Sequence, residues 1–454
     1  MDQKRRYFGT DGIRGRANVG CLTAGFAVRL GEAAADTFLA RRERTGTWPT
    51  VVVGKDTRQS CDMLESAVAA GLTSRGIDVR LAGVVPTPAV AMLVRDEGAA
   101  FGIVVSASHN PFEDNGIKFF GPEGYKLDDA LEREIESRLD GAAPVPHEGS
   151  VGRVAVQEGV ADRYVAFIRA SVGEDRDLLR GLRIAIDTAN GAASVTSPEI
   201  LRSLGAKVTA YHHHPNGINI NRDCGCTHPT EIGRIVRETG VDVGVSHDGD
   251  ADRVLLCDET GSILDGDEIM AIAALSMIAR GSLQDKTLVA TVMSNAGLDE
   301  ALRAVGGRVV RAAVGDRYVI EEMRRGGYNF GGEQSGHFIF RDHNTTGDGI
   351  LAAVQVLKIL RESGAPLSEL RRAMTKFPQV LRNLRVREWR PLEALAAAPR
   401  IAALEKTLGN SGRVLLRYSG TEPLLRLLVE GRDADFIAAE ADALIAAIHK
   451  EIGE

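Results

Sequence analysis

The feature that most constrains the fold of this chain is a unit that recurs three times at wide intervals. Each unit begins with a β-branched apolar run, continues through a turn and an amphipathic stretch, and reaches a glycine that precedes a second strand. The three runs are 51–54, 183–187 and 288–291, and the glycines are Gly76, Gly205 and Gly306. Strands that alternate with helices of this length form mostly parallel sheets, and glycine favours helix termination. The spacing therefore predicts three similar α/β domains rather than a short-period repeat array.

The chain beyond about Lys376 departs from this pattern. Alternating residues predict short strands at 381–386, 414–418 and 424–429, and an alanine-rich stretch from about Asp433 predicts a terminal helix. Together these indicate a separate α+β domain. The segment 141–152 is rich in glycine and proline and predicts a linker, and 258–261 predicts a hairpin turn that leads into the third unit. The expected domains are 1–155, 156–258, 259–373 and 374–454.

Composition and charge exclude several classes of protein. The net charge of −7 over 454 residues, without a basic block, argues against a nucleic-acid partner. The chain lacks a run of about 18 apolar residues, so no membrane span is expected. The basic residues 4–6 are not followed by the apolar segment of a signal peptide. Five cysteines without the spacing of a disulfide framework predict a reducing, cytoplasmic location.

Two short segments contain residue types that bind metals. Cys224 and Cys226 flank a glycine, and His212, His213 and His214 precede a Pro-Asn-Gly turn. A structural zinc site of the common kind needs a second ligand pair, and no second cysteine pair accompanies the first. We therefore expect a loop and a solvated turn, with metal binding as the alternative.

A cluster of polar residues follows the apolar run 101–105, which predicts a buried strand. Ser106, Ser108 and His109 come directly after it, and open α/β sheets bind their ligands at this end of their strands. No Gly-x-Ser-x-Gly motif surrounds Ser108, which argues against a hydrolase triad, and the chain has no phosphate-binding loop of the nucleotide kinases. We expect a nucleophilic or phosphorylated serine here.

A second polar loop carries a carboxylate at every second position. Asp248, Asp250 and Asp252 follow the apolar run 241–245 and can converge on one cation. Oxygen-only ligands suit a hard ion such as Mg²⁺. The loop is not an EF-hand, because the apolar run before it predicts a strand where an EF-hand has a helix. Like charges this close repel unless they share a cation, so we expect a metal site rather than a solvated acidic turn.

Two further loops carry groups suited to a phosphorylated, polyhydroxylated ligand. Glu333, Ser335 and His337 alternate with other residues in a glycine-containing loop and could hydrogen-bond to the hydroxyls or amine of a polar ligand. A loop near the C-terminus has the guanidinium, hydroxyl and glycine groups that bind phosphate. Its residues are Arg417, Ser419, Gly420, Thr421 and Arg426. A hairpin loop with satisfied polar groups and a surface arginine are the alternatives for the two loops.

Two cations complete the set. Arg14 lies in a glycine-flanked segment near the N-terminus, and Lys118 lies ten residues after Ser108. A site that holds a metal and phosphates needs such cations to balance developing negative charge. Together, the four loops and the two cations indicate phosphoryl transfer on a small phosphorylated ligand.

The four loops, in this order and one per expected domain, resemble the α-D-phosphohexomutase superfamily over essentially the whole chain. The segments 7–15, 106–111, 314–318 and 333–335 resemble its amino-sugar branch. The resemblance implies four domains around a central cleft, and interconversion of glucosamine 6-phosphate and glucosamine 1-phosphate on the route to UDP-N-acetylglucosamine. The alternative is the branch that acts on non-amino hexose phosphates. The resemblance leaves the oligomeric state open, with a homodimer as one alternative.

The resemblance also implies a role for each loop. Ser108 is the phosphoserine, and Asp248, Asp250 and Asp252 hold Mg²⁺ against its phosphate. The phosphoryl group passes to one end of the sugar phosphate, the resulting 1,6-bisphosphate reorients, and its other phosphate returns to the serine. A sugar 1,6-bisphosphate would also prime the enzyme.

The remaining site residues are assigned by the same resemblance. Lys118 is the candidate general acid or base, which requires a lowered pKa, with His109 as the next choice and Arg14 as a source of positive charge. Asp316 and Arg317 are expected beside the sugar, without a defined role. The implied substrate-binding residues are Glu333, Ser335, His337, Arg253, Arg417, Ser419, Gly420, Thr421 and Arg426.

Overall fold

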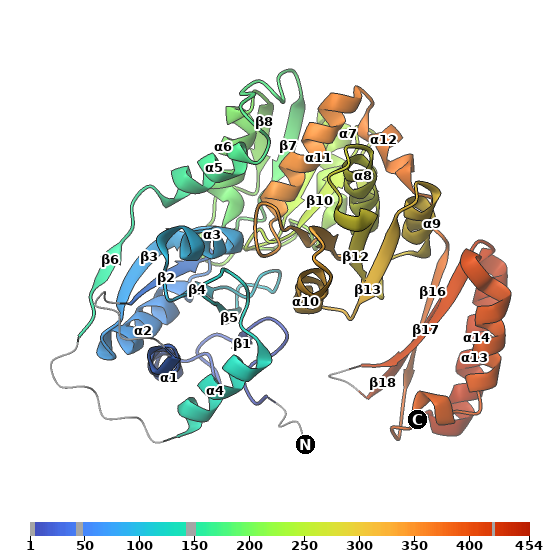
Figure 1. The fold of residues 1–454 in the computed structure, drawn as a ribbon, viewed down its shortest axis with the longest axis horizontal. Coiled ribbons are helices and arrows are strands. Elements are labelled where there is room, and N and C mark those ends of the chain that lie inside the picture. The colour runs from blue at the N-terminus through green and yellow to red at the C-terminus, as the bar shows by residue number, and fades with distance from the viewer. Residues whose placement is uncertain (1–4, 42–48, 142–150, 420–422) are drawn as a thin grey trace.

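Three of the four sheets share one pattern, in which three parallel strands are followed by an antiparallel fourth. The structure, a computed structural model, describes residues 5–41, 49–141, 151–419 and 423–454. The fourth sheet is entirely antiparallel. The expected fold class, three similar α/β domains followed by an α+β domain, is confirmed (Figure 1).

The first unit contains a six-stranded sheet of order β1-β5-β4-β2-β3-β6. Its strands are β1 (Ile13–Arg16), β2 (Thr50–Lys55), β3 (Asp78–Val84), β4 (Phe101–Val105), β5 (Asp114–Phe120) and β6 (Val154–Val156). Its helices are α1 (Ala24–Arg41), α2 (Cys61–Ser74), α3 (Thr87–Glu97) and α4 (Asp129–Asp140). The predicted linker lies mostly outside the described residues.

The second unit contains the sheet β11-β10-β9-β7-β8. Its elements are α5 (Val160–Ala170), β7 (Arg183–Asp187), α6 (Ala193–Ser203), β8 (Lys207–Tyr211), α7 (Pro229–Thr239), β9 (Val243–His247), β10 (Val254–Cys257) and β11 (Ile263–Leu264). The predicted turn at 258–261 joins β10 to β11, and these two strands pair. The hairpin therefore belongs to the second sheet, and the second unit reaches beyond the expected boundary at 258.

The third unit contains the sheet β13-β12-β14-β15. Its strands are β12 (Thr287–Thr291), β13 (Arg308–Ala312), β14 (Phe330–Gly332) and β15 (Phe338–Phe340). Its helices are α8 (Gly266–Ala279), α9 (Ala296–Ala304), α10 (Asp316–Gly326), α11 (Gly349–Ser363) and the short α12 (Leu367–Leu370).

The repeated glycines sit where the sequence pattern predicts. Gly76, Gly205 and Gly306 follow the ends of α2, α6 and α9 and have φ angles of +77°, +93° and +74°. L-residues with a side chain rarely adopt this left-handed conformation, so glycine is the residue that allows the chain to leave the helix and start the next strand.

The fourth unit has its own small core. Its strands are β16 (Gln379–Arg385), β17 (Gly412–Tyr418) and β18 (Leu424–Gly431), and its helices are α13 (Ala398–Leu408) and α14 (Ala434–Ile452). Asp433 caps the N-terminus of α14 by accepting the Phe436 N–H. The apolar cluster of this unit is separate from those of the other three.

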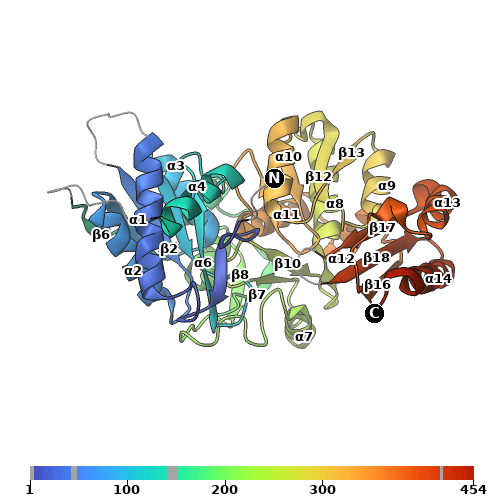
Figure 2. The same ribbon diagram turned by 90° about the horizontal axis from the view of Figure 1, so that it is seen from below.

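The first three units are joined more closely. One apolar cluster includes α3 and Phe120 of the first unit together with the cores of the second and third. Helix α11 of the third unit contacts α5 and α6 of the second. Figures 1 and 2 show the first and fourth units at opposite ends of the molecule, with the second and third between them. Within the described part of the chain, no helix is long and apolar enough to cross a membrane.

Candidate active site

A cavity of about 400 Å³ lies where the first three units meet. The N-terminal segment, the serine loop, the carboxylate loop and the 333–337 loop all contribute to its wall. Its acidic, basic and histidine lining residues are Asp11, Arg14, His109, Lys126, Asp252, Arg253, Asp316, Glu333 and His337. Loops that are far apart in the sequence therefore meet in one polar site, as the sequence analysis expected of most of them.

The serine loop is held in a strained and buried conformation. Ser108 has a φ of +53°, and its side chain is fully buried. Its Oγ donates to Asp248 Oδ2 at 2.7 Å and lies 3.3 Å from His109 Nδ1. The Ser108 N–H donates to Ser106 Oγ at 2.9 Å, and this hydroxyl donates to Asp56 at 2.6 Å. Ser106 thus supports the loop, whereas the Ser108 hydroxyl faces the carboxylate loop.

Two buried side chains donate hydrogen bonds to the carbonyl of Ser108. Arg58 Nη2 donates to this carbonyl at 2.7 Å, and Asn221 Nδ2 donates to it at 2.9 Å. Arg58 is 2% exposed and also pairs with Asp56. Several hydrogen bonds from surrounding side chains therefore hold the strained turn in place. Strained conformations at functional sites persist in this way.

The three carboxylates of the second loop converge, as predicted. One oxygen from each of Asp248, Asp250 and Asp252 lies within 4.8 Å of the others. Asp250 Oδ1 and Asp252 Oδ1 are buried, and neither has a hydrogen-bond partner among the described residues. Burial and the neighbouring carboxylates raise the pKa of Asp248 well above its usual value. Unpartnered, mutually repelling oxygens of this kind fit a hard divalent cation.

Lys118 lies within this group of carboxylates. Its Nζ is 2.7 Å from Asp250 Oδ2, 3.0 Å from Asp11 Oδ2 and 3.7 Å from Asp252 Oδ2. Burial favours the neutral amine, but the carboxylates outweigh it and raise the pKa of Lys118. The lowered pKa that a lysine base requires is therefore not found here. Lys118 is also absent from the cavity wall.

His109 lies closer to the cavity. Burial and the nearby guanidinium groups of Arg253 and Arg14 lower its pKa to about 4. The imidazole is therefore neutral at physiological pH and can accept a proton. Of the two candidate acid–base residues, His109 is the one that lines the cavity.

The 333–337 loop borders the cavity beside the start of α10. Glu333 Oε1 accepts the Gly315 N–H at 3.0 Å, which joins this loop to the α10 start. The backbones of His337 and Arg253 form an isolated β-bridge, so the loop also contacts the carboxylate loop. Both ring nitrogens of His337 are buried without a hydrogen-bond partner among the described residues.

The sequence analysis assigned no role to three residues of this network. Asp11 contacts Arg14, Lys118 and Lys126, and Thr87 Oγ1 donates to Asp250 Oδ2 at 2.6 Å. Asp11 lies in the same glycine-rich segment as Arg14, which is the signal that could have identified it. Lys126 and Thr87 carry no local motif, because their partners are distant in sequence.

The two arginines of the fourth loop lie in the small sheet of the fourth unit. Arg417 and Arg426 face each other across β17 and β18 and line a separate small pocket with Met293 and Leu381. Burial and the charge of Arg426 lower the pKa of Arg417. Ser419 is half-buried. Gly420 and Thr421 lie outside the described residues, and of the described residues of this loop neither Arg417 nor Arg426 lines the cavity.

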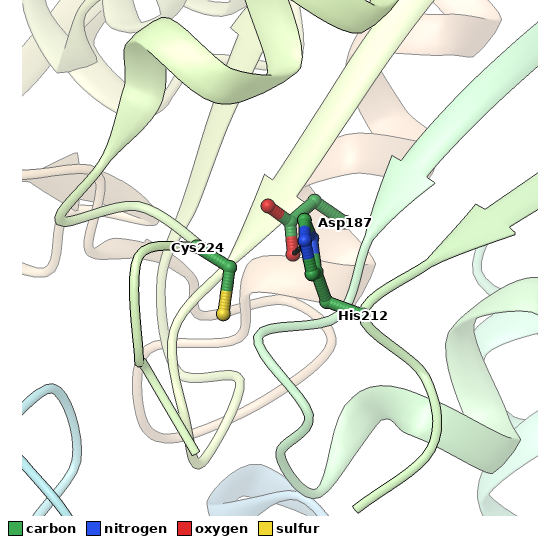
Figure 3. Close-up of side chains that lie close together, drawn as sticks. All are labelled: Asp187, His212 and Cys224. Carbon is green, nitrogen blue, oxygen red and sulfur yellow. Dashed lines mark ion pairs between the residues drawn. The ribbon is translucent and has the colours of Figure 1, made fainter. Parts of the chain in front are cut away.

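A second polar cluster lies in the second unit. Asp187, His212 and Cys224 come from the ends of β7 and β8 and from the loop before α7 (Figure 3). The Asp187 oxygens accept the N–H groups of Ala189 and Gly225, and His212 Nδ1 lies 3.2 Å from Asp187 Oδ1. Burial and nearby carboxylates raise the pKa of the Cys224 thiol to about 12. Asp187 therefore holds two loops by hydrogen bonds to their backbone. Because the pKa of Cys224 is raised, its thiolate is disfavoured as a metal ligand.

Models of one protein family match nearly the whole chain. The phosphoglucomutase/phosphomannomutase models match as α/β/α domain I at residues 5–144, domain II at 162–261, domain III at 265–377 and the C-terminal domain at 355–447. Among solved structures, a family member from Burkholderia thailandensis superposes with a TM-score of 0.81 at 24% identity, over 99% of both chains. The N-acetylphosphoglucosamine mutase of Aspergillus fumigatus, solved with GlcNAc-6P and magnesium, superposes with a TM-score of 0.66 at 17% identity, over 98% of this chain and 96% of that one.

Curated relatives are more similar. The phosphoglucosamine mutase of Pelobacter propionicus is 50% identical over 99% of both chains. The phosphoglucosamine mutase of Novosphingobium aromaticivorans is 50% identical over 98% of this chain and 99% of its own. With four matched domains and relatives of this similarity, the chain belongs to the phosphoglucomutase/phosphomannomutase family of phosphohexomutases.

Proposed function

We propose that this enzyme interconverts glucosamine 6-phosphate and glucosamine 1-phosphate through a phosphoserine at Ser108. The observation that carries the proposal is the position of the Ser108 hydroxyl, 2.7 Å from Asp248 in the carboxylate loop and one residue from the cavity wall at His109. The relatives named phosphoglucosamine mutase, at 50% identity over almost the full chain, support the choice of an amino sugar substrate.

Mg²⁺ fits the carboxylate loop. Asp248, Asp250 and Asp252 would hold it together with the Ser108 phosphate, and two of these carboxylates have a buried oxygen with no hydrogen-bond partner among the described residues. When bound, the ion neutralises charge that develops on the transferring phosphoryl group.

Residues of the chain itself bind the substrate, balance its charge and exchange a proton with it. The sugar phosphate enters the cavity, where Glu333 and Ser335 bind hydroxyls and Arg14 and Arg253 balance phosphate charge. His109, neutral and beside Ser108 Oγ, is placed to exchange a proton with the reacting sugar hydroxyl. Lys118, paired with Asp250, has a raised pKa, so it stays charged and stabilises negative charge near the carboxylate loop.

Transfer in the two directions needs two orientations of the sugar. The phosphate that is not reacting must be bound in the same way each time, and Arg417, Ser419, Gly420, Thr421 and Arg426 are the residues we assign to it. Because Arg417 and Arg426 line no part of the cavity here, the proposal requires the fourth unit to move toward the cavity when substrate binds. A sugar 1,6-bisphosphate would prime the serine, and the enzyme would act in the cytoplasm.

A coupled assay tests this function. Glucosamine 6-phosphate and glucose 6-phosphate are compared at saturating Mg²⁺ and after chelation. We expect a higher kcat/KM for the amino sugar, activity that depends on the metal, and loss of turnover in Ser108→Ala. A preference for glucose 6-phosphate would instead indicate the non-amino branch, and full turnover by Ser108→Ala would exclude the phosphoserine mechanism.

A further inference from the structure

We propose that Asp316 binds the ammonium group of the amino sugar and thereby sets the preference for amino over non-amino substrates. The inference rests on the proposed function and names the side chain that distinguishes the two substrate classes. Nothing in the sequence pattern assigned Asp316 a role beyond its position near the sugar.

The substrates differ at a single group. Glucosamine phosphates carry an amine at C2 that is protonated at neutral pH, whereas glucose phosphates carry a hydroxyl there. A carboxylate distinguishes the two, because a hydrogen bond between two charged groups is about twice as strong as a neutral one. The residue sought is therefore a carboxylate in the cavity wall with an oxygen free for the ligand.

In the part of the chain that the structure describes, four carboxylates line the cavity, and two of them have other roles. Asp11 already contacts Arg14, Lys118 and Lys126, so three cations surround it. Asp252 belongs to the carboxylate loop that would hold the metal. This leaves Asp316 and Glu333.

Glu333 already has a role in the proposed function, in binding groups that all hexose phosphates share. One of its oxygens accepts the Gly315 N–H at 3.0 Å, and the proposed function uses Glu333 for sugar hydroxyls. The same hydrogen bond places the start of α10, and hence Asp316, directly beside the hydroxyl-binding loop. The group that differs between the substrates is therefore assigned to Asp316.

Asp316 is held in place through one of its two oxygens. Its Oδ2 pairs with Lys126 and lies 3.4 Å from His337 Nε2. Among the described residues, no hydrogen bond or ion pair is found for Oδ1, and the side chain is 13% exposed at the cavity. The carboxylate is thus fixed and ionised, with one oxygen available to a ligand.

The backbone around Asp316 is fixed as well. The next residue, Arg317, is buried and donates from Nη2 to Glu132 at 2.6 Å and to the Leu127 carbonyl at 2.9 Å, both in the first unit. A carboxylate anchored on both sides loses little conformational freedom on binding, which is a requirement for strong discrimination. Lys126 acts here as a positioning residue.

The test is the ratio of kcat/KM for glucosamine 6-phosphate to that for glucose 6-phosphate in Asp316→Asn. We expect the value for the amino sugar to fall roughly tenfold to a hundredfold, the size of a lost hydrogen bond to a charged group. The value for glucose 6-phosphate should change by less than about threefold. A thermal melt of each variant shows whether the fold is retained.

Two control variants separate ammonium binding from a structural role. Lys126→Met removes the same ion pair but keeps the carboxylate that contacts the ammonium group. Because Lys126 only positions Asp316, the ratio should fall much less than in Asp316→Asn. Asp342→Asn replaces an exposed carboxylate of the third unit and should change neither substrate. A reduced ratio in Lys126→Met equal to that in Asp316→Asn would overturn the proposal.

A binding measurement gives a second readout that does not depend on turnover. Titration calorimetry of Ser108→Ala should show tighter binding of glucosamine 6-phosphate than of glucose 6-phosphate, and adding Asp316→Asn should remove the difference. If the wild-type enzyme prefers glucose 6-phosphate, the proposed function fails. If it prefers the amino sugar and Asp316→Asn keeps the full ratio, only the assignment of Asp316 fails.

Discussion

The first three units and the fourth unit are built in different ways. Buried charges join the first three, such as the pair between Lys118 and Asp250, whose side chains are each 1% exposed. The fourth unit has its own apolar core and meets the third through polar contacts around α9. These include the bond from Arg413 to the Ser294 carbonyl at 2.6 Å and the exposed pair of Arg432 with Glu300.

In the proposed function, the first three units carry out phosphoryl transfer and the fourth unit binds the distant phosphate. The serine, the carboxylate loop and the 333–337 loop lie in the closely joined part, where phosphoryl transfer needs exact positioning. The arginines assigned to the distant phosphate lie on the separately folded unit. The proposed function requires the fourth unit to move toward the cavity, and an anchor on such a unit would bind and release a substrate that must turn around between two half-reactions.

The largest expected effect is at Asp250, which joins the first two units. Asp250→Asn removes the charge that Lys118 and Thr87 contact and one of the three predicted metal ligands. We expect kcat to fall about a thousandfold, as is typical when a phosphoryl-transfer site loses its charge balance. Steady-state kinetics over a Mg²⁺ titration measures this, and a fall below tenfold would contradict the assignment of Asp250 to the metal.

The second largest expected effect is on stability, and it compares a buried contact between units with an exposed one. Arg317→Met removes a buried guanidinium that crosses from the third unit to Glu132 and Leu127 of the first. We expect a loss of about 3 to 5 kcal/mol in the free energy of unfolding. The matched control Arg432→Ala breaks an exposed pair and should cost less than about 1 kcal/mol. Chemical denaturation measures both, and equal costs would show that the contrast between the contacts is wrong.

A smaller effect is expected at the fourth unit. Arg417→Ala should raise KM for glucosamine 6-phosphate roughly tenfold, because a charge-assisted bond to phosphate is lost, with little change in the melting temperature. Arg382→Ala, an exposed arginine of β16 in the same sheet, is the matched control and should leave KM unchanged. An unaltered KM in Arg417→Ala would separate the fourth unit from substrate binding.

The smallest expected effect is a pH dependence of the unfolding free energy, from a carboxylate within the first three units. Burial raises the pKa of Asp348 to about 6, and Tyr164 of the second unit donates to its carboxylate at 2.7 Å. The folded state therefore keeps a proton that the unfolded state releases near pH 4, so this contribution to stability is complete below that pH and is lost as pH rises through about 6.

The slope from this single group is at most about 1.4 kcal/mol per pH unit. Unfolding free energies measured between pH 4 and 7 should show it in the wild type and not in Asp348→Asn. Asp162→Asn, an exposed carboxylate of α5, should keep the wild-type slope. An identical slope in Asp348→Asn would show that this carboxylate is not the group responsible.

The local pattern predicted most of the fold. Strand and helix periodicity with the terminal glycines indicated three α/β units and an α+β unit, and the structure has them. The hairpin at 258–261 was expected, but its place in the second sheet was not, because only the pairing of β10 with β11 determines it. Register between neighbouring strands is a tertiary property that a short turn does not encode.

The candidate site was predictable where residues lie close together in sequence. The spacing of Asp248, Asp250 and Asp252 was sufficient to predict that their oxygens converge. The contacts of Asp316 with Lys126 join residues 190 positions apart and could not be seen in either segment alone. The raised pKa of Lys118 was missed for the same reason, because Asp11 and Asp250 come from distant segments.

The central claim is that the Ser108 hydroxyl carries the phosphoryl group, and it has a direct test. The enzyme is incubated with glucosamine 1,6-bisphosphate and Mg²⁺, and the peptide containing Ser106 and Ser108 is analysed by mass spectrometry. We predict one phosphoryl group on Ser108 that is removed by a later incubation with glucosamine 6-phosphate. Turnover without any phosphate on Ser108, or a phosphate on Ser106 instead, would contradict the account.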